Sequence, residues 1–233
     1  MNKVIERVRK VPRYGIIGGF QFLGFQALSY LIANLIARLT GTVSWAIAPK
    51  IPAIDDLIPL FPPAVHIYMI SFVFWVCGTW MVSTTGRKNF MNYTISFIAA
   101  VAVGFLVFLF MPTYVDRVAE GGIAAAENPG ISNFVLKVAY FFDGWERGWN
   151  LFPSFHCMDS MFVYLGLRKS PEIKKSTKIT ALAMTLLICA STVLTKQHYC
   201  IDVIGGLSLA VICYAVVQKL DPAEKLIERG IHL

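Results

Sequence analysis

Charged residues are scarce in this sequence. Asp, Glu, Lys and Arg make up 15% of the 233 residues, and the mean hydropathy is +0.61. A soluble domain usually carries about 25% charged residues, which cover its surface with polar groups. Here 56% of the residues are hydrophobic, so the composition excludes an ordinary water-soluble globule. Lipid is the expected solvent for much of the folded chain.

Several other signals are absent. The sequence has no Gly/Ser-rich linker and no internal repeat, so one integral domain over residues 1–233 is expected. It has no metal-ligand cluster such as H-E-x-x-H, and we expect neither a metal nor another cofactor. The cysteines are odd in number and form no C-x-x-C pair, which disfavours a disulfide framework and a zinc site. They are Cys77, Cys157, Cys189, Cys200 and Cys213.

The hydrophobic residues gather in six segments. A helix needs about 20 apolar residues to cross a bilayer, and about 17 at the lower limit. The first three segments reach the full length, the last three lie near the limit, and none alternates as barrel strands do. We therefore predict an all-α polytopic membrane protein with six transmembrane helices in one bundle. The segments are residues 14–39, 62–82, 91–111, 151–167, 178–195 and 199–217.

The positive charges indicate how these helices are oriented. Of the 21 lysines and arginines, 15 lie at the termini and in the loops on the same side, and the other six lie opposite. Cytoplasmic loops are enriched in Lys and Arg, so both termini are expected in the cytoplasm. The formal net charge of +7 is then mainly a topology signal, and no nucleic-acid partner is expected. The oligomeric state is left open.

Two outer loops carry unusual sequences. The first contains P-A-I-D-D-L-I-P-L-F-P-P, which is too rich in proline for a regular helix, and its Asp55 and Asp56 are expected to be solvated. The second covers residues 112–153 and includes an apolar, aromatic stretch at 132–142. That stretch predicts a short helix in the membrane interface. The second loop also ends in the first of two histidine motifs, so we expect it to be the catalytic loop.

The motif K-Q-H-Y-C-I-D at 196–202 places His198 and Asp202 on one face of a helix, four residues apart. A carboxylate bound to one imidazole nitrogen fixes the tautomer and leaves the other nitrogen as a nucleophile or base. This spacing therefore predicts a catalytic dyad. The alternative is a pair that only satisfies itself in a low-dielectric site.

The motif F-P-S-F-H at 152–156 has the features of a helix start. Pro153 suits the first turn, and Ser154 with the following backbone N–H groups makes an anion site. His156 would donate a proton to a departing oxygen. The alternative is a helix cap followed by an interfacial histidine. Asp159 either orients His156 or faces a polar bundle interior.

Two cations are expected at the same depth as these motifs. Arg117 follows the third apolar segment and Lys196 ends the fifth, so both would supply positive charge to a phosphate. Each alone also fits a cation that extends to the interface. The joint occurrence of two histidines, a carboxylate, a serine and two cations at one membrane surface favours a phosphate-handling site.

These residues resemble the type 2 phosphatidic acid phosphatase superfamily, whose pattern is Lys-x6-Arg-Pro, Pro-Ser-Gly-His and Ser-Arg-x5-His-x3-Asp. The residues that match are Arg117, Pro153, Ser154, His156, Ser191, His198 and Asp202. The residues that depart from it are Phe110, Val118, Phe155 and Thr192. In these departures, and in its D-x-x-I-P-x-x-P and T-K-Q-H-Y stretches, the sequence is similar to the branch of the superfamily related to inositolphosphotransferases and sphingomyelin synthases.

The resemblance implies a mechanism. His198 would attack phosphorus and form a phosphohistidine, Asp202 would orient His198, and His156 would protonate the leaving alcohol. The non-bridging oxygens would be held by Arg117, Lys196, Ser154 and the backbone N–H of Phe155. Further support would come from Asn150 and Ser191.

The expected function is that of a metal-independent lipid phosphate phosphatase at the periplasmic or extracytoplasmic face. Its membrane lipid substrate would be phosphatidate, a polyprenyl diphosphate or a related lipid phosphate. One alternative is a lipid phosphotransferase that moves a phosphoryl or phospho-alcohol headgroup to a lipid or polyol hydroxyl. The missing family lysine and arginine would suit such a less charged substrate. An alternative of another class is a non-enzymatic haem-binding or transport protein with paired histidines.

Overall fold

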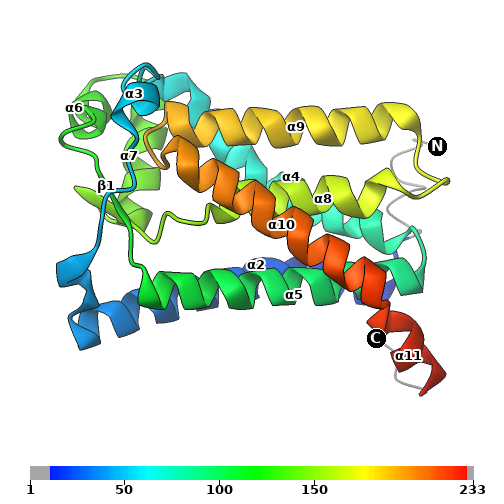
Figure 1. The fold of residues 1–233 in the computed structure, drawn as a ribbon. Helices are drawn as coiled ribbons and strands as arrows, with labels where there is room; N and C mark the ends of the chain where they lie inside the picture. The colour runs from blue at the N-terminus through cyan, green and yellow to red at the C-terminus, as the bar shows by residue number, and fades with distance from the viewer. Residues whose placement is uncertain (1–10, 230–233) are drawn as a thin grey trace.

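The computed structural model describes residues 11–229. Five of its helices are long and apolar enough to cross a membrane, and they lie along one bundle (Figure 1). They are α2 (Arg13–Thr40), α4 (Val65–Ser83), α5 (Arg87–Phe110), α9 (Lys175–Leu194) and α10 (Cys200–Leu220). The prediction of an apolar, all-α bundle is confirmed. Some of the charges used to orient the N-terminus, namely Lys3, Arg7, Arg9 and Lys10, lie outside the described residues.

The fourth predicted span forms a shorter helix, α8 (Phe155–Arg168), of 14 residues. At about 1.5 Å per residue, α8 is about 21 Å long, less than the roughly 30 Å of a bilayer core. It packs against α4, α5, α9 and α10, and most of its residues are buried. A helix surrounded by other helices is not required to match the lipid thickness. The span predicted at approximately 151–167 begins a few residues too early, and the helix starts after the Ser154 cap, within the predicted F-P-S-F-H motif.

The two ends of the described chain lie at the same end of the bundle. The Tyr14 hydroxyl of α2 donates to the Ser83 carbonyl of α4 at 3.4 Å. Lys88 of α5 forms a 2.6 Å ion pair with Asp221, which follows α10. A short helix, α11 (Pro222–Glu228), continues from there and packs against α5. Figure 1 shows α11 at the end opposite α3, α6 and β1.

The opposite end is built from the two predicted outer loops. The proline-rich loop holds only short helical turns, which are η1 (Thr42–Trp45), α3 (Pro52–Asp55) and η2 (Pro62–Ala64). The second loop holds β1 (Tyr114–Asp116), α6 (Gly122–Glu127), α7 (Ile131–Asp143) and β2 (Arg147–Trp149). Helix α7 covers the predicted interfacial stretch and exposes Phe134, Phe141 and Phe142. The antiparallel pair β1–β2 was not expected, and it closes the second loop onto itself.

Asp55 shows that the proline-rich loop packs onto the bundle. Its carboxylate accepts hydrogen bonds from the backbone N–H groups of Cys200 at 2.9 Å and Ile51 at 2.7 Å. The expectation of a solvated Asp55 is wrong, because the side chain caps the start of α10, where the helix dipole favours a negative charge. The neighbouring Asp56 remains exposed and pairs with Lys50 at 2.6 Å.

Removing the Asp55 cap is expected to destabilise the fold. Asp55→Ala leaves two backbone N–H groups without their acceptor, and we expect the free energy of unfolding to fall by about 2–3 kcal/mol. Thermal unfolding of the purified protein in detergent measures the change. The matched control is Asp56→Ala, which removes only an exposed ion pair worth about 0–1 kcal/mol. Equal shifts for the two variants would contradict this role of Asp55.

Candidate active site

The turn between α9 and α10 positions the second histidine motif. The carbonyl oxygen of Thr192 accepts hydrogen bonds from the backbone N–H groups of both Gln197, at 3.0 Å, and His198, at 3.1 Å. Lys196 has a left-handed backbone, with φ of 50°, which allows the chain to reverse between the helices. His198 is therefore fixed two residues before Cys200, the first residue of α10.

His198 and Asp202 lie close together, although His198 is in the turn before α10 and not on the helical face that the four-residue spacing predicts. The distance between Nδ1 of His198 and Oδ2 of Asp202 is 3.4 Å. The same carboxylate oxygen accepts a 2.8 Å hydrogen bond from the backbone N–H of Tyr199, so Asp202 also caps α10. The cap holds a fully buried carboxylate behind the imidazole. Nδ1 of His198 faces this carboxylate without forming a hydrogen bond in the described chain.

The first histidine motif is fastened to α10. The backbone N–H of Ser154 donates to the carbonyl of Asp202 at 3.0 Å. The Ser154 hydroxyl is buried and accepts from the Cys157 N–H at 3.4 Å, as a helix cap does. The side chain of Phe155 packs against Phe108, with ring centroids 4.7 Å apart. Phe155 therefore turns its ring into the gap beside α5, while its backbone stays at the helix start.

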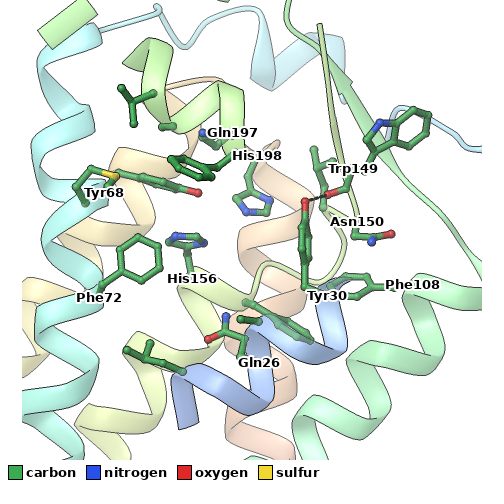
Figure 2. Close-up of a pocket in the computed structure, with 18 residues that line it drawn as sticks. Gln26, Tyr30, Tyr68, Phe72, Phe108, Trp149, Asn150, His156, Gln197 and His198 are labelled. Atoms are coloured by element: carbon green, nitrogen blue, oxygen red, sulfur yellow. Dashed lines mark hydrogen bonds between the residues drawn. The ribbon is translucent and has the colours of Figure 1, made fainter. Parts of the chain in front are cut away.

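His156 projects from the first turn of α8 toward His198 (Figure 2). The two imidazole centroids are 6.2 Å apart. The ring of Tyr68 stacks on His156 at 4.1 Å, and Trp75 meets it edge-on at 5.0 Å. In the described part of the chain, Nε2 of His156 has no hydrogen-bond partner. The aromatic contacts hold the ring, and its distal nitrogen remains free for a ligand.

Both histidines line one cavity of about 390 Å³. Its walls come from α2, α4, α5, α7, α8, β2 and the turn before α10, and they are mainly apolar. None of the 18 lining residues, all within 11–229, is a lysine, arginine, aspartate or glutamate. The lining side chains that carry hydrogen-bonding groups include Gln26, Tyr30, Tyr68, Asn150, His156, Gln197 and His198. The cavity thus suits a molecule with a long apolar part and a small polar group.

Arg117 lies behind the cavity wall. The guanidinium is fully buried and donates to the carbonyls of Gly144 and Tyr140 and to Oε1 of Gln197. It also lies over the Tyr140 ring, 4.2 Å from the centroid. Arg117, which directly follows β1, therefore connects this strand by hydrogen bonds to the C-terminal end of α7 and to the turn before α10.

Lys196 is held by protein groups above the cavity. Its ammonium donates to the carbonyl of Ile58 at 2.9 Å and lies 3.3 Å from the carboxylate of Glu120. Glu120 also pairs with Lys50 at 2.7 Å and accepts from the Tyr199 hydroxyl at 3.2 Å. Hydrogen bonds that Lys50 donates to the carboxylates of Asp56 and Glu120 raise the pKa of Lys50. Lys196 is two residues from His198 in the sequence, but its ammonium group is directed to Glu120.

The three remaining predicted residues lie in different places. Asn150 lines the cavity, and its amide donates to Asn34 at 3.1 Å. Asp159 lies beside Gln26 in a smaller cavity and faces the bundle interior, the second of its two predicted positions. The hydroxyl of Ser191 donates to the carbonyl of Ile188 within α9, at 2.7 Å.

Gln197 is a further candidate for a functional residue, and its role was not predicted from the sequence. It belongs to the quoted K-Q-H-Y motif, but no role was predicted for it. The side chain is 2% exposed and lines the cavity next to His198. Its position beside the dyad histidine was the available signal, and the direction of the side chain was not readable from the sequence.

The contact between α8 and α10 requires a glycine. A Cβ built at Gly206 would overlap the carbonyl oxygen of Ser154, which is backbone and cannot rotate away. Gly206→Ala is therefore expected to lower stability by about 1–3 kcal/mol and to reduce activity, because the two histidine motifs separate. Gly24→Ala is the matched control. A Cβ there has nothing within 4 Å, so we expect a small gain, about 0.5–1 kcal/mol. Losses of equal size in thermal unfolding would contradict the prediction.

Two comparisons with known proteins give a match. Residues 63–216 match the model of the PAP2 superfamily. The chain is also similar to the inositol phosphorylceramide synthase catalytic subunit aur1 of Schizosaccharomyces pombe, with 27% identity over 111 residues. That match covers 46% of this chain and 24% of the yeast protein. No solved structure matches the chain.

The family match spans every element that carries a predicted catalytic residue. It includes α8 with His156 and the start of α10 with His198 and Asp202. The matched region is well over half of the chain. The chain therefore belongs to the PAP2 superfamily, whose pattern its histidine motifs resemble.

Proposed function

We propose that the protein transfers the phosphoryl group of a membrane lipid through a phosphohistidine at His198. The observation that carries this proposal is the pair of imidazoles at the polar part of an apolar cavity, with centroids 6.2 Å apart. Behind His198, the Asp202 carboxylate lies 3.4 Å from Nδ1. This is the order of nucleophile, orienting carboxylate and proton donor that covalent catalysis needs.

In the first step, Nε2 of His198 attacks phosphorus. A P–N bond forms, the P–O bond to the leaving group breaks, and Asp202 stabilises the positive charge on the imidazole. His156, entering as the imidazolium, gives its Nε2 proton to the departing oxygen. The products of this step are the free alcohol, neutral His156 and phosphorylated His198.

In the second step, a water or alcohol hydroxyl attacks the phosphohistidine. His156 takes its proton, a new P–O bond forms, and the P–N bond breaks. His198 is regenerated and His156 again carries the proton. Nucleophile and proton transfer are both supplied by side chains of the chain, and we propose that the reaction is metal-independent.

The non-bridging oxygens would lie at the start of α8. The first N–H groups of a helix have no partner within it, so those of Phe155 and His156 suit an anion. Ser154 supports this position as the cap rather than as a direct ligand. Direct contacts from Arg117 and Lys196 would require each side chain to leave its present protein partners.

A phosphotransferase is the second candidate, and the uncharged cavity favours it. A phosphate monoester carries up to two negative charges, whereas a phosphodiester carries one. A site whose lining within residues 11–229 has histidines and amides but no lysine or arginine fits the diester better. The similarity to an inositol phosphorylceramide synthase subunit supports the same direction. We propose transfer to a lipid or polyol hydroxyl as the alternative to hydrolysis.

The proposed topology has six crossings, with α8 as the fourth, and an active site on the outer face. The ion pair of Lys88 with Asp221 and the bond between Tyr14 and Ser83 lie at the opposite end of the bundle from the histidines. The basic residues of that end support its cytoplasmic location.

A substrate panel tests the function. Purified protein in mixed micelles is incubated with labelled phosphatidate, with a polyprenyl diphosphate, and with a phospholipid plus a lipid alcohol. Free phosphate without a new lipid supports the phosphatase, and a new phosphorylated lipid supports the transferase. Turnover of none of the three, by protein that is folded in detergent, would overturn the proposal.

A further inference from the structure

Gln197 has an amide group that protein contacts leave half satisfied. Its Oε1 accepts a hydrogen bond from Arg117, which can only donate. This contact fixes which end of the amide faces Arg117, so Nε2 faces the other way. Across residues 11–229, Nε2 finds no hydrogen-bond partner although the side chain is 2% exposed. A buried donor in this state indicates a ligand.

The same amide belongs to the cavity of the two histidines. Gln197 lines that cavity together with His156 and His198 (Figure 2). The backbone N–H groups of Gln197 and His198 share the Thr192 carbonyl as acceptor, at 3.0 and 3.1 Å. The amide and the proposed nucleophile are therefore held by one rigid turn. A group that reacts at His198 lies beside the Gln197 side chain.

Within residues 11–229, no lysine or arginine lines the cavity beside this amide. Arg117 donates to Gly144 and Tyr140 as well as to Gln197, and Lys196 is directed to Glu120. Gln197 is thus the side chain through which Arg117 reaches the cavity. The amide is a neutral donor, but the guanidinium polarises it and strengthens its N–H groups as donors, since hydrogen bonds in series strengthen one another.

We propose that Nε2 of Gln197 donates a hydrogen bond to a non-bridging oxygen of the phosphoryl group, with Arg117 as the positioning residue behind it. The inference rests on the proposed function and names the substrate class, because a neutral donor matches a singly charged phosphodiester. In the transition state the non-bridging oxygens gain charge, so the bond strengthens there and raises kcat as well as binding.

The test compares Gln197→Met, which keeps the length but has no donor, with Gln218→Met. Gln218 also has an amide nitrogen without a partner in the described chain, but it lies in the last turn of α10, at the end of that helix remote from Gln197. We expect Gln197→Met to lower kcat/KM by about 10- to 100-fold and to raise the inhibition constant of orthovanadate by a similar factor. Gln218→Met is expected to change neither.

Two further variants separate positioning from direct contact. Gln197→Glu keeps a partner for Arg117, so the fold is retained, but places a carboxylate at the phosphoryl oxygens, and we expect a loss larger than that of Gln197→Met. Arg117→Lys should lower kcat/KM in the wild-type background and add little to Gln197→Met, because both act through one amide.

The outcomes distinguish the two proposals. In one outcome, the wild-type protein turns over a lipid, and Gln197→Met stays within twofold of it in both kcat/KM and the inhibition constant of orthovanadate. This result would overturn the role of Gln197 and leave the phosphohistidine mechanism standing. Fully multiplicative losses for Arg117→Lys and Gln197→Met would overturn the positioning role. Absence of any lipid turnover by the wild-type protein would overturn both proposals.

Discussion

Replacing His198 by alanine is expected to lower kcat/KM by at least about 10⁴-fold, the scale seen when a covalent nucleophile is removed. Asp202 lies 3.4 Å behind Nδ1 of His198, and the cavity lies on the other side. Within residues 11–229 no other imidazole occupies that position relative to a buried carboxylate. The measurement is steady-state turnover of the best lipid substrate.

The same variant should lose the covalent intermediate. Brief incubation of wild-type protein with a labelled lipid phosphate, followed by denaturation, is expected to leave an acid-labile label that His198→Ala lacks. His66→Ala is the matched control, because His66 is exposed and contacts Ser132 at 3.1 Å on the outer surface. We expect normal turnover and labelling in that control. A folded His198→Ala protein with normal turnover would eliminate the mechanism.

Replacing His156 by glutamine is expected to lower turnover of alkyl phosphate lipids by about 10²- to 10⁴-fold, the usual contribution of a general acid. The imidazole is held by Tyr68 and Trp75, and its Nε2 has no partner in the described chain. A lipid alkoxide is a poor leaving group and needs the proton that His156 supplies.

An aryl phosphate ester provides the internal control for this variant. A nitrophenolate leaves without protonation, so His156→Gln should slow its cleavage much less than that of an alkyl ester. Breakdown of the intermediate still needs a base, so the labelled phosphoenzyme should accumulate. Equal losses with alkyl and aryl esters would show that His156 acts through structure rather than through proton transfer.

Local features of the site were predictable from the sequence because they depend on residues that are close together in the chain. The closeness of His198 and Asp202 was predicted, but the turn before α10 produces it, because the helix begins at Cys200. The helix start at F-P-S-F-H was also predicted, and Ser154 is its cap, the alternative reading of that motif. The length of the first apolar segments predicted α2, α4 and α5 within a few residues. The start of α8 was predicted too early, because apolarity continues through Leu151 and Phe152, which precede the helix.

Contacts between distant segments were not predictable. Asp55 and Cys200 are 145 residues apart, and the cap that Asp55 makes depends on how the proline-rich loop packs onto α10. The charge of Lys196 goes to Glu120 for the same reason, since β1 and α6 bring that carboxylate over the turn. A charged residue has many possible partners in sequence, and only the packing of loops selects one.

The sequence by itself determined that this chain is a helical membrane protein with two histidine motifs of a phosphoryl-transfer family. Hydrophobic length and helical period are local properties, and they fix which side chains share a face. Tertiary structure decided which polar groups reach the cavity. It turned Arg117 and Lys196 toward protein partners and left the Gln197 amide beside His198. The reason is that buried charges take the partners that the fold provides, whereas a buried donor without one remains available to a ligand.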